Sequence, residues 1–295
     1  MDRRTLFTLL AVGAAQALTS CSADPARPEP SAAGGPRPIS EPVPAPAPAS
    51  ASASAPGRTI EVQTTAPQAG AATQRALPPI PAARPGSPSV VFGAPAPTRR
   101  IAITIDDGYS PETVAGYVEF ARRSGIPITF APNGAYRAIW DRHADVLRPL
   151  IEAGQVQIAN HTWTHLNLLG RPDDAIRADI DKNEDWIERT FGIASRPWFR
   201  PPYGAHNGHV NALVGELGFT RILLWNGSFG DSTLISPEQL MDLARRYLQP
   251  GTIMIGHANH QTILGLFDQI QQLIADRKLE PVTLDTMFQT SRAVG

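Results

Sequence analysis

Apolar and polar positions follow two different patterns along this chain, and the pattern changes near Pro97. Beyond that point, short apolar runs typical of buried strands alternate with segments in which apolar residues recur every three or four positions, as on one face of a helix. The predicted strands span 101–105, 126–130, 156–159, 221–225, 252–255 and 282–284. The predicted helices span 111 to near Gly125, 146–153, 175–191, 210–217, 237–248 and 263–275. This alternation predicts an α/β domain over 98–295, built on a mainly parallel sheet or barrel.

Acidic and imidazole side chains gather close behind the predicted strands. They are Asp106, Asp107, His161, His165, Asp231 and His257. The carboxyl ends of parallel strands meet at one edge of a domain, and that edge is where the active sites of α/β proteins assemble. We therefore expect these side chains to share one site.

The chain before this domain has few of the large apolar residues that a core needs. Residues 22–97 contain 18 of the 29 prolines, together with many Ala, Ser and Gly residues, which predicts a disordered linker. An alternative for its last part is that 89–93 adds a strand to the domain, and the sequence leaves this open.

Residues 1–21 have the features of an export signal. Arg3 and Arg4 precede an apolar run that is too short to span a membrane, and Leu18-Thr19-Ser20-Cys21 follows it. The last four residues resemble a bacterial lipobox, which implies that Cys21 becomes the lipidated first residue of the mature protein. The alternative is an ordinary secretory signal, which would release the protein, and the sequence does not separate Sec from twin-arginine export.

Charge and cysteine content exclude several kinds of chemistry. The 26 basic and 27 acidic side chains balance over 295 residues, so neither a polyanion-binding surface nor a nucleic-acid partner is expected. Cys21 is the single cysteine, which excludes an intrachain disulfide and a thiolate metal site. A metal site in this chain must therefore use histidines and carboxylates.

Asp107, His161 and His165 form a candidate metal site. The four-residue spacing of the histidines predicts that both imidazoles lie on one face of a helical turn. Two neutral imidazoles and one carboxylate suit Zn²⁺, with Co²⁺ or another divalent ion as alternatives, and leave coordination positions open for water and substrate. Non-haem iron oxygenases use the same ligand types, but the ligand order and the lack of a strand-rich pattern count against that class.

Two further segments complete a family resemblance. Residues 199–204 read Phe-Arg-Pro-Pro-Tyr-Gly, and 252–257 end a buried strand with a histidine. Together with the Asp-Asp-Gly run at 106–108 and the two histidines, in this order, they resemble the motifs of the polysaccharide deacetylases, the NodB-homology or carbohydrate esterase family 4 proteins. The resemblance covers about 99–288 and implies a distorted (β/α) barrel.

The resemblance implies a role for most of these residues. Asp106 would be the general base, and Arg200 would hold its carboxylate. The backbone N–H of Tyr203 would help to form an oxyanion hole. The metal ligands would be Asp107, His161 and His165. Amide hydrolysis needs an activated water, a stabilised oxyanion and a proton for the departing amine, and His257 would supply that proton as the general acid.

The fourth motif departs from the family pattern. Asp231, which would orient His257, is followed by Ser232 where the family has tryptophan. The missing indole removes an apolar wall of the expected sugar groove. Candidates to replace it are Trp163, Trp198 and Phe229, although core packing is the favoured interpretation for most of these aromatics. Ala258 and Tyr109 also differ from many relatives, without removing a catalytic group. The remaining histidines, expected at the surface or in loops, are His143, His206, His209 and His260.

The function implied is that of a metal-dependent hydrolase that removes N-acetyl groups from a cell-envelope polysaccharide. Peptidoglycan is the preferred substrate, at N-acetylglucosamine or N-acetylmuramic acid residues, because a lipid anchor and a long linker would hold the domain at the wall. Chitin, poly-N-acetylglucosamine and acetylated xylan are alternatives within the same chemistry. The alternative of another class is a non-catalytic wall-binding lipoprotein. We expect a monomer that is extracytoplasmic and anchored to the cell membrane.

Overall fold

Parallel strands surrounded by helices make up the part of the chain that the structure describes. The computed structural model describes residues 88–288. The strands are β1 (Ser89–Val91), β2 (Arg100–Asp107), β3 (Ile128–Pro132), β4 (Val156–Ile158), β5 (Trp198–Phe199), β6 (Arg221–Leu223), β7 (Gly227–Ser228), β8 (Ile253–His257) and β9 (Glu280–Pro281). The helices are α1 (Pro111–Ser124), α2 (Arg137–Trp140), α3 (Ala144–Glu152), α4 (Asp173–Phe191), α5 (Gly208–Glu216), α6 (Pro237–Tyr247), α7 (Phe267–Asp276) and α8 (Leu284–Phe288). Four short 3-10 helices join them: η1 (Gly134–Tyr136), η2 (Asp141–His143), η3 (Pro202–Gly204) and η4 (Gln261–Gly265).

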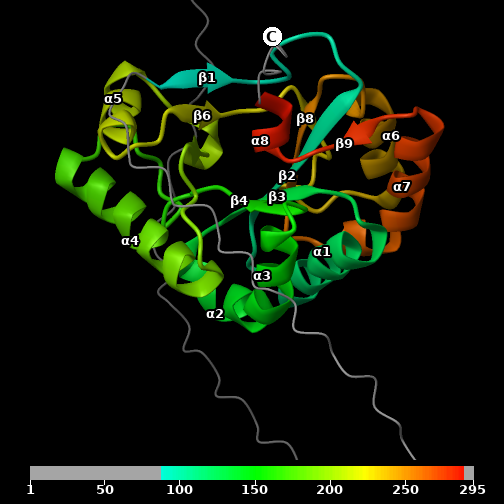
Figure 1. The fold of residues 1–295 in the computed structure, drawn as a ribbon, viewed down its shortest axis with the longest axis horizontal. Coiled ribbons are helices and arrows are strands. Elements are labelled where there is room, and N and C mark those ends of the chain that lie inside the picture. The colour runs from blue at the N-terminus through cyan, green and yellow to red at the C-terminus, as the bar shows by residue number, and fades with distance from the viewer. Residues whose placement is uncertain (1–87, 289–295) are drawn as a thin grey trace, which may run out of the picture. The chain divides into compact units, whose positions relative to one another are not determined.

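The strands close into a distorted barrel, as the sequence predicts. One sheet has the order β4-β3-β2-β8-β7, and a second has the order β1-β6-β5. A parallel bridge between Asn160 and Phe199 joins the end of β4 to β5. On the other side, β6 and β7 are parts of one run, 221–228, that pairs first with β5 and then with β8. The two sheets therefore form one ring, surrounded by helices (Figure 1).

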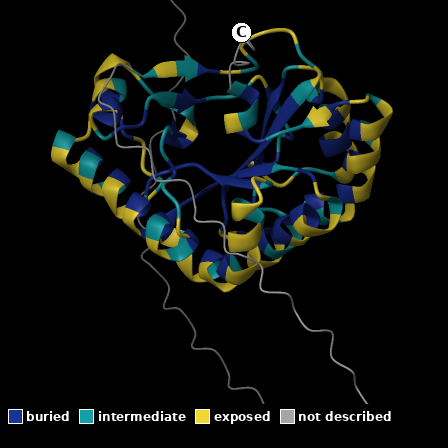
Figure 2. Ribbon diagram, in the orientation of Figure 1, coloured by how far each residue is buried: buried dark blue, intermediate teal, exposed yellow. Residues whose placement is uncertain are grey.

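Both faces of β2 are buried, because one faces the helices and the other faces the barrel interior. Ile101, Ile103 and Ile105 pack in the large core beneath α1 and α7, whereas Ala102 belongs to a smaller cluster inside the barrel. The alternation places Thr104 and Asp106 on the inner face as well. Figure 2 shows these central strands buried, with exposed residues on the outer faces of the helices. The strand thus carries a carboxylate into the interior at its last positions.

Short-range signals set the ends of the helices that follow the site strands. Ser110 caps α1 by accepting a hydrogen bond from the Thr113 N–H, and Pro111 occupies the first turn. Gly125 ends α1 in the left-handed conformation. Within 88–288, no helix has the length and apolar character that a membrane span requires.

The folded part begins earlier than composition indicated. Ser89–Val91 forms β1 and pairs in parallel with β6, which is the alternative that the sequence left open. Gly93 then bridges to Thr252 at the start of β8. The boundary expected at Pro97 therefore lies inside the folded part of the chain. Residues 1–87, which include the predicted signal segment and Cys21, lie outside the described residues.

Two predictions near the carboxyl end were wrong. The strand expected over 282–284 does not form there. The strand β9 ends earlier, at Pro281, and the helix α8 begins at Leu284. Leu284 and Met287 lie three residues apart and both pack into the cluster inside the barrel, so a short helix buries them better than a strand would. The helix expected over 263–275 is divided into η4 and α7 at Leu266.

We predict that Gly256→Ala destabilises the barrel. A Cβ atom there would lie 2.9 Å from the Phe229 ring and 3.0 Å from the Ile105 side chain, both in the core. Overpacking of this kind costs about 1–3 kcal/mol of unfolding free energy, which urea denaturation measures. Gly265→Ala is the control, because a Cβ atom there meets nothing within 4 Å. Equal stability of the two variants would contradict the packing described.

Candidate active site

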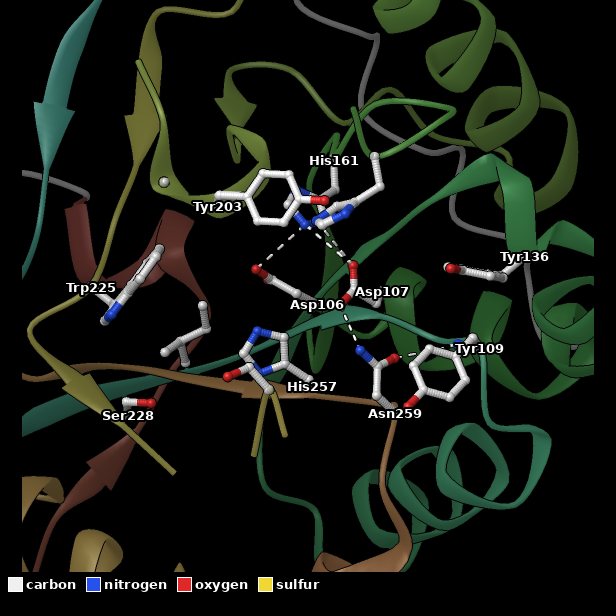
Figure 3. A pocket seen from close by; sticks show the side chains of 14 residues that line it. Asp106, Asp107, Tyr109, Tyr136, His161, Tyr203, Trp225, Ser228, His257 and Asn259 are labelled. Carbon is white, nitrogen blue, oxygen red and sulfur yellow. Dashed lines mark hydrogen bonds and ion pairs between the residues drawn. The ribbon is translucent and has the colours of Figure 1, made fainter. Parts of the chain in front are cut away.

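Three potential metal ligands converge at the carboxyl end of the barrel. Asp107 ends β2, and His161 and His165 lie in the loop after β4. The Nε2 atoms of His161 and His165 lie 3.6 Å and 3.4 Å from the Asp107 Oδ1 atom. One ligand atom from each of the three residues lies within 4.8 Å of the other two. The sequence predicted this convergence, and Figure 3 shows the side chains of Asp107 and His161 pointing toward each other.

The loop that carries the histidines is not the helical turn that the sequence predicted. Thr162 and His165 have φ angles of 64° and 56°, which no right-handed helix contains. Asn160 accepts a hydrogen bond from the Thr162 N–H at 2.9 Å, and Asn133 donates to the carbonyls of His161 and Thr162. Both asparagines are buried. Side-chain amides, not helical hydrogen bonds, therefore bring the imidazoles together.

The donor atoms suit a divalent cation. The His161 Nδ1 atom lies 2.7 Å from the Arg200 carbonyl oxygen, which only an Nδ1–H tautomer satisfies, so the lone pair lies on Nε2. The Asp107 Oδ1 atom is buried and has no hydrogen-bond partner. A buried carboxylate oxygen without a partner is costly unless a cation or proton faces it. The described residues therefore fit a metal ion held by Asp107, His161 and His165.

The pKa values of two of these ligands favour the forms that bind metals. Burial alone would raise the pKa of Asp107, but the neighbouring imidazoles, His161 foremost, lower it well below its ordinary range. Burial and the neighbouring His161 lower the pKa of His165 below 6.5. An ionised carboxylate beside a neutral imidazole is therefore expected near neutral pH.

A buried ion pair holds Asp106 beside the ligands. The Arg200 Nη1 atom donates to both carboxylate oxygens of Asp106, at 3.0 Å and 2.9 Å, and its Nη2 atom donates to Thr104 Oγ1 at 2.8 Å. The Arg200 side chain is fully buried. Burial lowers the pKa of Arg200, and the charge of Asp106 opposes that effect. The Asp106 Oδ2 atom lies 3.6 Å from His161 Nε2, so this carboxylate borders the candidate metal position.

His257 and Asp231 form a second pair across the site. The His257 Nδ1 atom lies 3.0 Å from Asp231 Oδ1, and the backbone N–H of His257 donates to Asp231 Oδ2 at 3.1 Å. Burial alone would lower the pKa of His257, but the hydrogen bond to Asp231 and the charges of Asp106 and Asp107 raise it above 6.5. The pair therefore favours a protonated imidazole near neutral pH.

Comparison with known proteins supports the family resemblance. The sequence profile of the polysaccharide deacetylase family matches residues 93–222, which include Asp106, the three candidate ligands and Arg200. Over these residues the chain is similar to the polysaccharide deacetylases. The match ends before the pair of Asp231 and His257, which the geometry alone adds to the candidate site.

Two curated relatives and two solved structures show how far the similarity extends. The peptidoglycan-N-acetylglucosamine deacetylase of Bacillus cereus is 27% identical over 68% of this chain and 72% of its own. Chitin deacetylase 1 of Saccharomyces cerevisiae is 27% identical over 61% of this chain and 59% of its own. A crystal structure of the Bc1960 peptidoglycan N-acetylglucosamine deacetylase has a TM-score of 0.61 at 25% identity, covering 68% of this chain and 94% of that one. A carbohydrate esterase family 4 pseudoenzyme from Bacillus anthracis has a TM-score of 0.60 at 19% identity, covering 68% and 69%, and shares the fold.

A cavity of ≈ 470 Å³ opens at the candidate site. Its lining includes Asp106, Asp107, Tyr109, Tyr136, His161, His165, Tyr203, Gly204, Trp225, Ser228, Ser232, Ile255, His257 and Asn259. Figure 3 shows Trp225 on the side of Ser228, and Tyr109 and Tyr136 on the side of Asn259. The cavity therefore joins the carboxylates and imidazoles to aromatic walls, an arrangement typical of small-ligand sites.

The aromatic walls are not those that the sequence proposed. Trp198 and Phe229 are buried in the core, and Trp163 packs against Gly134 and Trp186, so none of the three lines the cavity. Trp225 lines it instead, with the Arg200 guanidinium carbon 5.3 Å from its ring centroid. The sequence could have indicated Trp225 as a wall residue. Trp225 ends the predicted strand 221–225, and the candidate site lies at the carboxyl ends of the strands.

Other sequence candidates lie around the site: Tyr203 lines the cavity, whereas Arg200, Asp231 and His260 do not. Arg200 is buried beneath the cavity, and Asp231 lies behind His257. The Tyr203 side chain is exposed, its φ angle is 60°, and its ring centroid lies 4.7 Å from that of His165. His260 contacts the Tyr109 hydroxyl. The remaining histidines, which are absent from the cavity lining, are His143, His206 and His209.

We predict that Arg200→Met lowers the unfolding free energy of chelator-treated protein by about 3–5 kcal/mol, because Asp106 would remain buried without its cation. The double variant R200M/D106N should recover part of that loss. Arg245→Met is the control, since Arg245 pairs with Asp242 in solvent, and exposed pairs contribute at most about 1 kcal/mol. A similar loss in both single variants, measured by urea denaturation, would contradict the assigned burial.

Proposed function

We propose that this protein is a metal-dependent hydrolase that removes N-acetyl groups from peptidoglycan, at N-acetylglucosamine or N-acetylmuramic acid residues. One observation carries the proposal: Asp107, His161 and His165 converge on one point, with Asp106 and His257 lining the same cavity. Zn²⁺ is the proposed ion, with Co²⁺ as an alternative, because imidazole and carboxylate donors suit both.

The proposed reaction begins with a water molecule beside Asp106. A divalent cation held by the three ligands would lower the pKa of that water and polarise the acetyl carbonyl. Asp106 accepts the proton of the water, and Arg200 holds the carboxylate in place through its two hydrogen bonds. The oxygen of the water then attacks the carbonyl carbon of the acetamide.

The remaining steps use the backbone of Tyr203 and the side chain of His257, two residues that both line the cavity. The backbone N–H of Tyr203 stabilises the negative charge that develops on the carbonyl oxygen. His257 gives its proton to the amide nitrogen as the C–N bond breaks, so acetate and a free amine leave. Asp231 holds the imidazole in the orientation and charge state that this transfer requires.

The fold alone does not separate this proposal from a non-catalytic glycan-binding role, since one of the structural neighbours is a pseudoenzyme. The functional groups favour catalysis. The proposed base and the proposed acid each have a buried partner: Arg200 holds Asp106, and Asp231 holds His257 in the motif that departs from the family pattern. Glycan binding without acetate release from Zn²⁺-loaded or Co²⁺-loaded protein would support the binding role instead.

Peptidoglycan is preferred among the glycans for two reasons. The Bacillus cereus relative bears the name of a peptidoglycan deacetylase, and the proposed lipidation at Cys21 with the proline-rich linker would hold the domain near the wall, as a membrane-anchored extracytoplasmic lipoprotein. Chitin oligomers, poly-N-acetylglucosamine and acetylated xylan remain competing substrates, because the same groups cleave amides and esters. Acetate release from a panel of these glycans separates them.

We predict that Asp107→Ala loses bound metal and acetate release together, because it removes a ligand. Asp106→Asn should retain about one metal ion per chain and lose about 10²–10⁴-fold in turnover, because it removes only the base. Metal content by mass spectrometry and acetate release from peptidoglycan give the two measurements. Asp268→Asn, at an exposed ion pair with Arg123, is the control. Full activity in D106N would refute the assigned base.

We predict that Asp231→Asn moves the alkaline limb of the pH–rate profile to lower pH. The pKa of His257 is raised above 6.5, partly by Asp231, so the protonated acid persists above that pH in the parent protein. Removing the charge of Asp231 lowers that pKa, and proton donation is then lost at lower pH. The measurement is the pH dependence of acetate release, and an unshifted limb would contradict this role of Asp231.

A further inference from the structure

Asn259 lies against the candidate metal ligand Asp107, although no motif drew attention to it. Its side-chain Nδ2 atom donates to Asp107 Oδ2 at 2.7 Å. Its Oδ1 atom lies 3.3 Å from the Gly108 nitrogen and 3.4 Å from the Tyr109 nitrogen and accepts from both. Figure 3 shows the amide between the carboxylate of Asp107 and the start of the next loop.

These contacts fix the orientation of the amide. A flipped amide would place its oxygen against a carboxylate oxygen and its NH₂ group against two backbone N–H groups, so each contact would become repulsive. Asn259 therefore presents a donor to Asp107 and an acceptor to the turn that follows. It lies in the loop after β8, two residues beyond His257. The same strand therefore positions both the proposed acid and this amide.

The turn that Asn259 contacts is strained and is held from its other side as well. Asp107 has a φ angle of 68°, and Gly108 has a φ angle of 118°. The Trp140 Nε1 atom donates to the Asp107 carbonyl at 2.9 Å, and a Cβ atom on Gly108 would lie 2.2 Å from that indole nitrogen. Trp140 thus fixes the backbone of Asp107, while the contact to its carboxylate comes from Asn259.

The carboxylate needs such a contact because its terminal torsion is soft. Rotation about the Cβ–Cγ bond of aspartate is broad, so the backbone alone does not decide which oxygen faces the histidines. With Oδ2 engaged by Asn259, Oδ1 is the oxygen that faces His161 and His165, and it has no hydrogen-bond partner. One oxygen is thereby reserved for a cation and the other is withheld from it.

We propose that Asn259 is a positioning residue that holds Asp107 as a one-oxygen metal ligand and keeps a coordination position open for water and substrate. This inference rests on the proposed metal site. Removing a hydrogen bond to a metal ligand typically lowers metal affinity or activity about 10–100-fold. A merely structural role, in which Asn259 only caps the turn through its oxygen, would change stability without changing the coordination of the ion.

The test compares metal binding and coordination in three variants of the full chain with the parent protein. Asn259→Ala removes all of these contacts, and it should weaken Zn²⁺ binding about 10–100-fold in a chelator competition assay. Asn226→Ala is the matched control, because it also removes an asparagine whose Oδ1 atom accepts a backbone N–H, here that of Ile253 at 2.9 Å, at the other end of β8. N226A should bind Zn²⁺ as the parent does.

Asn259→Asp isolates the donor. It keeps an acceptor for Gly108 and Tyr109, which N259A loses, but it replaces the N–H that faces Asp107 Oδ2 with a second carboxylate oxygen. The added carboxylate itself attracts cations, so the readout for N259D is the visible spectrum of bound Co²⁺, which reports coordination number and geometry, and we expect it to differ from that of the parent. The same change is expected for folded N259A.

Each result separates this inference from the proposed function. If the parent fails to bind Zn²⁺ or Co²⁺, the metal site and this inference both fall. If the parent binds metal and D107A does not, the metal site stands. The role of Asn259 is then overturned if folded N259A binds Zn²⁺ within about threefold of the parent, or if the Co²⁺ spectrum of N259D matches that of the parent.

Discussion

The buried guanidinium of Arg200 connects the parts of the candidate site. Its nitrogens bind Asp106 and Thr104 on β2, and its backbone carbonyl accepts the Nδ1–H of His161. Its planar group also lies against the ring of Trp225. One residue from the loop after β5 therefore fixes the proposed base, one proposed ligand and one aromatic wall relative to one another. A charge buried inside a barrel is costly to desolvate, and the pair is better explained by the positions that it imposes than by net stability.

Backbone strain collects at the same place. Among the described residues, the non-glycine positions with positive φ angles are Asp107, Thr162, His165, Tyr203 and Lys278. Each of the first four lies in a loop that carries or borders the candidate ligands. Such conformations cost about 1–3 kcal/mol each and persist where surrounding contacts determine them. Here side-chain amides supply those contacts: the buried Asn133 and Asn160 hold the histidine loop, and the half-buried Asn259 faces Asp107.

The sequence predicted the larger part of the fold and of the candidate site, because both depend on local patterns. The apolar run at 101–105 and the Ser-Pro start and glycine end of α1 are short-range signals, and the polar residues after the strands follow from parallel topology. The histidine spacing suggested a helix because spacing records only separation along the chain. The actual loop depends on Asn133 and Asn160, which contact it from other elements. The same limit applies to Trp225 and Asn259, which acquire their positions only when the ring of strands closes.

The departure at Ser232 can now be placed in physical terms. Ser232 lines the cavity, so the substitution puts a hydroxyl where an indole was expected on the wall. It leaves the Asp231–His257 pair intact, because Asp231, the residue before Ser232, accepts both hydrogen bonds of that pair. The aromatic surface of the cavity comes from other elements: Trp225 after β6, and Tyr109 and Tyr136 after β2 and β3. The substitution therefore acts on the surface that a sugar would contact and not on the groups that would move protons, so its effect belongs to the choice of glycan.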